Sequence, residues 1–155
     1  MKKMTIWGVG PKIMTPGYLI LFVLSRIPVK ISIRETLNIP GVYINAVSFI
    51  LIFLGIIMLA VASMDIKKAL EKGQLATSGL FSRMRNPMYA SHIIFIMPGV
   101  CFLTDKALTL LSIFCTLILF YSLISKEEKD LEENFGTEYT DYKKRVRRLL
   151  PGLKN

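Results

Sequence analysis

Two polar stretches contain the residue types that could do chemistry in this chain. The first, at 77–89, reads Thr-Ser-Gly-Leu-Phe-Ser-Arg-Met-Arg-Asn-Pro-Met-Tyr, and the second, at 127–139, reads Glu-Glu-Lys-Asp-Leu-Glu-Glu-Asn-Phe-Gly-Thr-Glu-Tyr and continues to Pro151. Almost forty mostly apolar residues separate them. An apolar segment of that length can cross a membrane twice, because a spanning helix needs roughly 20 residues. We therefore expect a helical hairpin that brings the two polar stretches together at one membrane surface.

The side chains in these stretches suit a ligand that has an amino acid group, a cationic centre and a purine. Arg85 has a fork of donors that matches a carboxylate. Glu127 and Glu128 are anionic partners for an ammonium group, and Asn86 can both donate and accept hydrogen bonds. Flat faces for an adenine or a cation come from three tyrosines, Tyr89, Tyr139 and Tyr142. S-adenosylmethionine is such a ligand, although a nucleotide or a lipid head group would also use several of these side chains.

Other kinds of site are not indicated by the sequence. It has no Gly-x-Gly-x-x-Gly motif after a strand, so a soluble Rossmann-type site is not expected. No Ser/His/Asp or Cys/His constellation is present, and we expect no metal site. Cys101 and Cys115 lie in apolar segments, where they are expected to be buried small hydrophobic residues. His92, the only histidine, follows Tyr89 by one helical turn and suits either helix packing or the lining of a pocket.

The composition indicates one membrane domain. The chain has 155 residues, of which 52% are hydrophobic, and its mean hydropathy is +0.48. The net charge of +9 would suggest a nucleic-acid partner in a soluble chain. Because the apolar runs are long, we expect the basic residues to contact anionic lipid head groups instead, and we expect no nucleic acid. The oligomeric state is left open.

Four membrane-spanning helices are predicted, so the expected fold class is an all-α polytopic membrane protein with a cytosolic helical tail. The predicted spans are 14–33, 41–64, 88–104 and 107–125. The second is the clearest, because no charge interrupts it. The third contains Pro98 and Gly99, so it suits a kinked span or a re-entrant element. The first is the weakest, because Arg26, Pro28 and Lys30 break its second half.

The distribution of positive charge predicts the orientation. With four spans, the N-terminus, the loop at 65–87 and the tail at 126–155 share one side, which holds sixteen of the twenty basic residues. The positive-inside rule then places both termini in the cytoplasm of a multi-pass membrane protein. We expect a single domain over 1–155, in which 14–64 forms the first two spans and 88–125 forms the helical hairpin.

Each polar stretch also has a purely structural interpretation. Asn86-Pro87 is a common helix start, with asparagine as the N-cap and proline at the first helical position. Gly136 suits a helix stop, and a second helix is predicted at about 138–148. This basic helix could simply lie on the bilayer with its cations near lipid phosphates.

Several spaced motifs follow one another along the chain. They are Leu75-x-Thr77-x-Gly79-x-Phe81 with Arg85-Asn86-Pro87-Met88-Tyr89, then the apolar hairpin, then Glu127-Glu128-x-x-Leu131 with Phe135-Gly136-x-x-Tyr139-x-x-Tyr142, and finally Arg148-Leu-Leu-Pro151. Their order resembles the isoprenylcysteine carboxyl methyltransferase family, whose superfamily also holds phospholipid N-methyltransferases. The resemblance covers roughly residues 45–152.

The resemblance implies an integral membrane enzyme that binds S-adenosylmethionine at the cytosolic end of its last helices. Arg85, Pro87 and Tyr89 match the family's Arg-His-Pro-x-Tyr motif, and Glu127 and Glu128 match its Glu-Glu motif. Together with the residue types above, this predicts the cofactor-binding residues Gly79, Arg85, Asn86, Tyr89, Glu127, Glu128, Tyr139 and Tyr142. The predicted catalytic residues are Arg85, Asn86 and Glu128.

Position 86 departs from the family pattern, because Asn86 stands where the better-known eukaryotic members have histidine. Asparagine keeps its hydrogen bonds but cannot act as a base near neutral pH, so we expect it to position the cofactor. The predicted reaction is direct methyl transfer to a lipophilic, membrane-embedded acceptor, which is either a carboxylate or an amine. The acceptor is expected to enter sideways from the bilayer, through an opening near Pro98 and Gly99.

Two other classes of function remain open at this point. A membrane reductase on a related scaffold would use a nicotinamide cofactor, and the arginine cluster of the tail gives weak support for the 2′-phosphate site that it needs. A non-catalytic membrane protein would use the cationic tail to bind lipid. This last class predicts that Asn86, Glu127 and Glu128 can be changed without loss of function.

Overall fold

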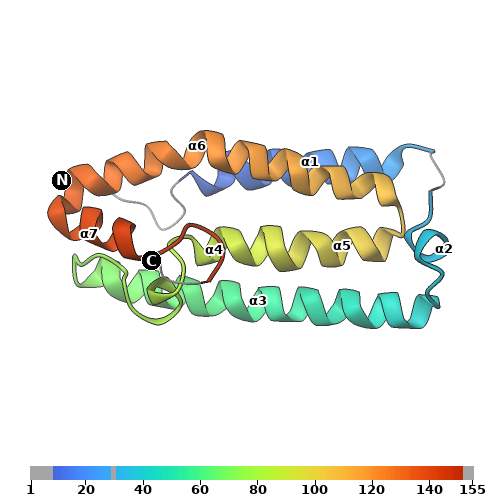
Figure 1. Ribbon diagram of the computed structural model, residues 1–155, viewed down its shortest axis with the longest axis horizontal. Helices are drawn as coiled ribbons and strands as arrows, with labels where there is room; N and C mark the ends of the chain where they lie inside the picture. The colour runs from blue at the N-terminus through green and yellow to red at the C-terminus, as the bar shows by residue number, and fades with distance from the viewer. Residues whose placement is uncertain (1–8, 29–30, 152–155) are drawn as a thin grey trace.

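The computed structural model, which describes residues 9–28 and 31–151, is built from helices that lie along its longest axis (Figure 1). The α-helices are α1 (Gly10–Arg26), α2 (Ile33–Leu37), α3 (Gly41–Glu71), α4 (Pro87–Ala90), α5 (Met97–Thr104), α6 (Leu111–Phe135) and α7 (Thr137–Arg145). The other helical turns are the 3₁₀-helices η1 (Gly79–Ser82) and η3 (Ala107–Leu110) and the π-helix η2 (Ser91–Ile96). The all-α fold class is therefore confirmed.

Three helical segments of the described residues are long and apolar enough to cross a membrane. They are Gly41–Glu71, Pro87–Thr104 and Ala107–Phe135, which correspond to the predicted spans 41–64, 88–104 and 107–125. The polytopic membrane fold is thus confirmed. The first and last of these helices continue past their apolar parts as charged extensions, at 65–71 and 126–135, and we expect these extensions to lie outside the membrane.

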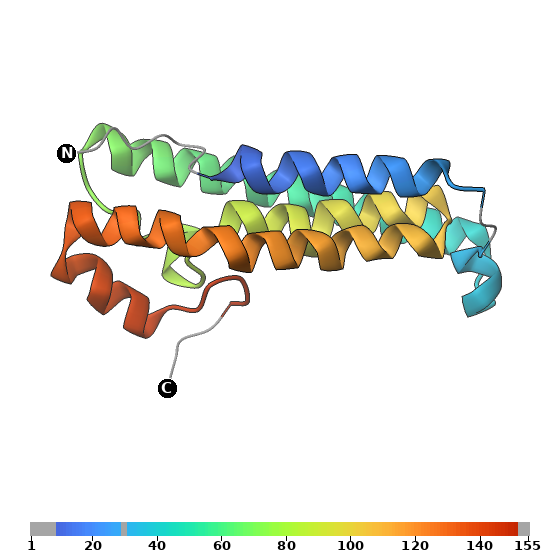
Figure 2. The same cartoon turned by 90° about the horizontal axis from the view of Figure 1, so that it is seen from above.

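The first predicted span, 14–33, is wrong at its end, because α1 begins at Gly10 and stops at Arg26. Proline disfavours helical backbone in the residue before it, so Pro28 accounts for the end: Ile27 is extended, with a ψ of 134°. With 17 residues, α1 is at the lower limit for a spanning helix. It runs beside α6 (Figure 2), and a Cβ at Gly17 would overlap the side chain of Thr116 there. We keep α1 as a predicted fourth span.

The third span is continuous rather than broken. From Pro87 to Thr104, α4, η2 and α5 follow one another without a gap. Pro98 cannot donate a helical hydrogen bond, and the π-helical turns of η2 directly before it accommodate the change in backbone bonding. A Cβ at Gly99 would lie only 2.9 Å from the Ser48 carbonyl oxygen of α3. The opening expected at Pro98 and Gly99 is therefore closed on the side of α3, because small residues let the two helices approach closely.

At the end of the molecule near α2, the α5–α6 connection ties the elements together (Figure 1). Asp105 accepts hydrogen bonds from the Arg34 backbone N–H (2.9 Å), from Arg34 Nε (2.7 Å) and from the Ser32 hydroxyl (2.8 Å). Lys106 Nζ donates to the Ser25 carbonyl oxygen near the end of α1. These contacts hold α1 and α2 against the hairpin, at the end that is opposite to the two polar stretches.

At the other end, α6 continues to Phe135 and stops where Gly136 adopts a φ of 54°, as predicted. The predicted second helix at 138–148 is wrong at its end, because α7 stops at Arg145. Val146 is extended, and Arg147 forms an isolated parallel β-bridge with Met84. Backbone pairing with a segment sixty residues earlier thus replaces the last helical turn.

Candidate functional site

The two polar stretches meet through their backbones at this end of the bundle. The Arg85 N–H donates to the Arg147 carbonyl oxygen (2.8 Å), and the Asn86 N–H donates to the Arg148 carbonyl oxygen (3.0 Å). Asn86 Nδ2 also donates to the Arg148 oxygen (3.3 Å). Asn86 and Pro87 do start α4 as predicted, but the Asn86 side chain makes no capping hydrogen bond. Its amide holds the tail instead.

Glu128, in the charged extension of α6, is surrounded by three cations. Arg148 binds it in a bidentate manner, since Arg148 Nε donates to Oε1 (2.9 Å) and Nη2 donates to Oε2 (2.8 Å). Arg85 Nη1 lies 3.1 Å from Oε1, and Lys143 Nζ lies 3.5 Å from Oε2. Only 3% of Glu128 is exposed. It therefore anchors both Arg85 and the tail.

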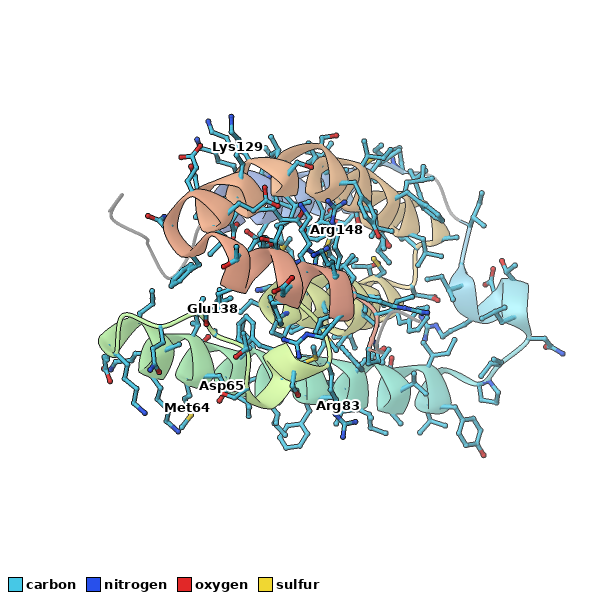
Figure 3. All side chains as sticks on the ribbon, turned by 60° about the vertical axis from the view of Figure 1, so that its left-hand side comes forward. Met64, Asp65, Arg83, Lys129, Glu138 and Arg148 are labelled. Atoms are coloured by element: carbon cyan, nitrogen blue, oxygen red, sulfur yellow. The ribbon has the colours of Figure 1, made fainter. Side chains whose placement is uncertain are left out.

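These partners keep Glu128 ionised. Burial on its own would raise the pKa of the Glu128 carboxyl, but the hydrogen bonds from Arg148 and the nearby positive charges outweigh it and hold the pKa below its usual value. The pKa of Arg148 is raised in turn, mainly by its hydrogen bonds to Glu128. Figure 3 shows Arg148 among the helices near the centre of the view, whereas Lys129 projects from the edge of α6.

Glu127 has different surroundings from its neighbour. Its Oε2 accepts hydrogen bonds from the Tyr89 hydroxyl (2.8 Å) and from the Val9 backbone N–H (3.1 Å). Burial raises the pKa of the Glu127 carboxyl, and these two hydrogen bonds offset only part of that effect. None of the residues that the structure describes donates a hydrogen bond to its Oε1. Glu127 is therefore the more basic of the two carboxylates.

A cavity of about 340 Å³, which we call the first cavity, lies between the ends of α3 and α6, the loop after α3, and α7. Small-molecule sites in proteins usually have volumes of about 300–1,000 Å³, so this cavity can hold a cofactor. The predicted site residues in its lining are Arg85, Asn86, Glu127, Tyr139 and Tyr142.

Tyr139 and Tyr142 form an aromatic wall of the first cavity from α7. Their ring centres are 6.1 Å apart. Both residues are buried, with an exposed fraction of 2% for Tyr139 and 4% for Tyr142. The Tyr142 hydroxyl donates to the Phe81 carbonyl oxygen (2.7 Å), which ties α7 to η1. Burial raises the pKa of both phenols, so both are neutral at physiological pH. They offer flat, uncharged faces to a ring.

Arg85 has a buried donor that the protein does not use. Only 7% of the residue is exposed, and its Nε has no hydrogen-bond partner among the described residues. Its Nη1 contacts Glu128 as an ion pair without hydrogen-bond geometry. Buried donors without partners are rare and costly in folded proteins. Arg85 can therefore bind an anionic group of a ligand.

A second cavity, of about 270 Å³, lies between the start of α1 and α4. Gly10 and Met14 line it from α1, and Tyr89 and His92 line it from α4 and η2. The Tyr18 hydroxyl of α1 lies 2.8 Å from His92 Nδ1, so the histidine packs between helices and also lines a cavity. Three of the predicted residues line both cavities, namely Arg85, Asn86 and Glu127.

Two predicted cofactor-binding residues lie outside the lining of both cavities. Glu128 is enclosed by its cations, so direct contact with a cofactor would require one of them to move away. Gly79 lies against Asp65 of α3, where a Cβ atom would overlap the carboxylate. Its φ of 59° forms the turn in which the Leu80 N–H donates to Asp65 Oδ2 (3.3 Å). Both residues support neighbouring parts of the site, and direct contact of either one with a cofactor stays a prediction.

Sequence reasoning missed Val9 and the pairing of Arg148 with Glu128. Val9 contributes only a backbone N–H, which leaves no signal in the residue type. Arg148 stands in the last of the recognised motifs, but nothing in the sequence distinguishes it from the exposed Arg147 beside it. The partner of each became visible only in the fold.

The fold and the site define a polytopic α-helical membrane protein with a divided, charged cavity at one end of its spans. Among protein-family models, phospholipid methyltransferase matches residues 17–138. The chain belongs to this family of integral membrane methyltransferases, which confirms the resemblance seen in its motifs. The comparisons with curated proteins and with solved structures give no match. The matched segment ends just before Tyr139, so the part of the tail that closes the first cavity lies outside it.

Proposed function

We propose that this protein transfers a methyl group from S-adenosylmethionine to a lipophilic acceptor in the membrane. The observation that carries this proposal is the pair of adjoining cavities that share Arg85, Asn86 and Glu127. A transferase must hold donor and acceptor close together and aligned, and two cavities with a common wall provide a place for each. The family supports methyl transfer to lipid substrates as the class of reaction.

The first cavity suits S-adenosylmethionine. Arg85, with its unused Nε donor, suits the carboxylate, and Tyr139 and Tyr142 suit the adenine. Glu127 and Asp130, which both line this cavity, suit the two positive charges of the cofactor. When bound, the cofactor supplies an electrophilic methyl group.

The second cavity suits the reacting end of the acceptor. Gly10, Pro11 and Met14 of α1 line it with apolar surface, and Asn86 and Glu127 provide polar groups. The apolar part of the acceptor would stay in the bilayer. The proposal covers both kinds of acceptor that the sequence suggested: a carboxylate, as in isoprenylcysteine carboxyl methylation, and an amine, as in phospholipid N-methylation.

The residues of the chain mainly orient the reactants and exclude water, which direct transfer requires. Glu128 holds Arg85 in place from behind the cavity wall. Asn86 fixes the tail through Arg148, and this contact helps to close the first cavity. We further propose that this end of the protein, with both termini, faces the cytoplasm, because most basic residues lie there.

Calorimetry of the detergent-purified protein with S-adenosylhomocysteine, the demethylated product, tests this proposal. We expect binding, and we expect Tyr139→Leu to weaken it by about tenfold or more, because stacking of a base on an aromatic ring contributes about 1–3 kcal/mol. Leucine keeps the site apolar, so the fold should persist. The control is Tyr121→Leu, an exposed tyrosine of α6 outside both cavities. No binding by the wild-type protein would refute the function, and unchanged affinity in Tyr139→Leu would refute the placement of the adenine.

A further inference from the structure

His92 is an ionisable side chain inside a helical segment that is long enough to span the membrane. It lies in the segment Pro87–Thr104, one helical turn beyond Tyr89, and it lines the second cavity. Ionisable residues within spanning helices are rare, and they usually face a cavity or the bundle interior, where they have a partner and a function. One partner is Tyr18 of α1, whose hydroxyl lies 2.8 Å from His92 Nδ1 and whose ring meets the imidazole edge to face.

Tyr18 determines which ring nitrogen of His92 carries the hydrogen. A phenol O–H in an apolar span is costly without an acceptor, and Nδ1 is the acceptor that the described residues provide for it. Tyr18 therefore donates to Nδ1, and the neutral imidazole carries its own hydrogen on Nε2. Tyr18 lies outside the lining of both cavities, so it orients the imidazole from behind.

The other ring nitrogen, His92 Nε2, is a donor that the described part of the chain does not use. It makes no hydrogen bond there, and it is not sealed in the protein either, because the buried side-chain atoms without a partner among the described residues belong to Arg85. The space that His92 lines is the second cavity, whose lining also includes the apolar side chains of Pro11, Met14 and Met88. A donor in such surroundings favours a ligand that brings an acceptor.

We propose that His92 Nε2 donates a hydrogen bond to an uncharged carbonyl oxygen of the acceptor molecule, deeper in the membrane than the reacting group. The inference rests on the proposed function, applies to either kind of reacting group and adds a specificity-determining residue. At 1.5 Å per residue, His92 lies about 4.5 Å beyond Tyr89 along the helix. An ester or amide carbonyl a few bonds from the reacting atom reaches that depth.

A charged oxygen does not fit this position. The cation among the described lining residues of the second cavity is Arg85, which already pairs with Glu128 at 3.1 Å. An anionic group one turn into the span would leave water without gaining a cation of its own, which is costly. A carbonyl is cheaper to desolvate, and a neutral imidazole N–H is a matching donor for it.

The test compares two neutral amphiphiles that have the same glycerol head and the same chain length, 1-octanoylglycerol and 1-O-octylglycerol. They differ in the ester carbonyl, which the ether lacks. Binding is measured by calorimetry of the detergent-purified full chain saturated with S-adenosylhomocysteine. We expect the ester to bind roughly three- to tenfold more tightly than the ether, which is the usual effect of one neutral hydrogen bond.

Two substitutions separate the donor in the cavity from the contact with Tyr18. The side-chain amide of asparagine can replace Nδ1, and that of glutamine can replace Nε2. We therefore expect His92→Asn to keep the Tyr18 contact and to lose the preference for the ester. The matched control, His92→Gln, should lose the Tyr18 contact and keep most of the preference. Both variants should keep S-adenosylhomocysteine affinity within about threefold, because His92 does not line the first cavity.

The inference is overturned if the wild-type protein binds the two amphiphiles equally or binds neither of them. It is also overturned if His92→Asn keeps the preference and His92→Gln loses it, because His92 would then only pack against Tyr18. Loss of S-adenosylhomocysteine binding in His92→Asn would indicate misfolding, and the wild-type preference and its retention in His92→Gln then decide. Failure of the wild-type protein to bind S-adenosylhomocysteine at all would instead remove the proposed function itself.

Discussion

Glu127 and Glu128 are adjacent in the chain, yet they do different things because successive residues of an α-helix point about 100° apart. Glu127 reaches the junction of the two cavities, and Glu128 reaches Arg85 and the tail. The sequence predicted that both belong to one site, and they do lie together. It could not predict which of them lines a cavity, because that depends on the rotation of α6 relative to its neighbours.

At the residue scale, we expect Glu128→Gln to lower the free energy of unfolding by about 3–5 kcal/mol. Arg85 is buried and Arg148 is partly buried, and the substitution removes the negative charge that both pair with. Removing one partner of a buried ion pair is strongly destabilising. Thermal unfolding in detergent measures the effect. Glu133→Gln serves as the control with an exposed carboxylate on the same helix. Equal unfolding midpoints for the two variants would contradict the anchoring role of Glu128.

Because of the Glu128 carboxylate, we expect the stability of the fold to decrease at acid pH. Its pKa in the folded protein lies below the usual glutamate value, so its stabilisation is fully present above that value and is lost as the pH falls through the folded pKa. We expect the unfolding midpoint to start to fall as the pH drops below the usual glutamate value of about 4.3 and to continue to fall at lower pH. The fall should be clearly smaller in Glu128→Gln, which has no proton to bind there. Parallel acid curves for both proteins would show that other groups are responsible.

At the element scale, local sequence patterns predicted where the apolar helices run. They failed where contacts with a distant segment determine the end or the continuity of a helix. The uncharged run at 41–64 gave the start of α3 at Gly41. The end of α7 was misplaced, because the residues after Arg145 pair with Met84, Arg85 and Asn86, and this competition is not visible in a local pattern. Likewise, Pro98 and Gly99 read as a break, but tight packing on α3 keeps the helix continuous.

Arg148 is the residue that joins the segment after α7 to Glu128 of α6. We expect Arg148→Ala to increase hydrogen exchange at the Arg85 and Asn86 amides by roughly ten- to hundredfold, because those amides donate to the tail and the bidentate contact with Glu128 is worth about 1.5–3 kcal/mol. Exchange followed by mass spectrometry measures this. Arg147→Ala is the control, since it removes an exposed neighbour and keeps the same backbone. Equal exchange in both variants would mean that the backbone pairing holds without the ion pair.

At the scale of the whole molecule, the helices divide the chemistry between two ends. The loop after α3, the end of α6 and α7 gather at one end, and α2 with the α5–α6 connection lies at the other (Figure 1). The positive charge predicted this polarity from the sequence, because the basic residues cluster in the segments that now share one end. The two cavities could not be predicted, because they arise where four separate parts of the chain meet.

This arrangement predicts a labelling pattern for three exposed positions. We expect Lys72→Cys and Glu138→Cys to react with a membrane-impermeant maleimide only in inside-out vesicles, and Glu35→Cys to react only in right-side-out vesicles. The parent protein, whose Cys101 is buried and whose Cys115 lies in a span, provides the background. Labelling of Lys72→Cys and Glu138→Cys from opposite sides would rule out the four-span topology.

The length of α3 links the site to the thickness of the membrane. Its uncharged part, 41–64, is about 36 Å long at 1.5 Å per residue, whereas a typical hydrocarbon core is about 30 Å thick. A helix that is longer than the bilayer tilts, and the tilt follows the local thickness. Because η2 and α5 pack on α3 at Gly55 and Gly99, we expect the start of α4, and Asn86 with it, to follow a change in the tilt of α3. We therefore expect the thickness of the bilayer to affect how the two cavities are aligned.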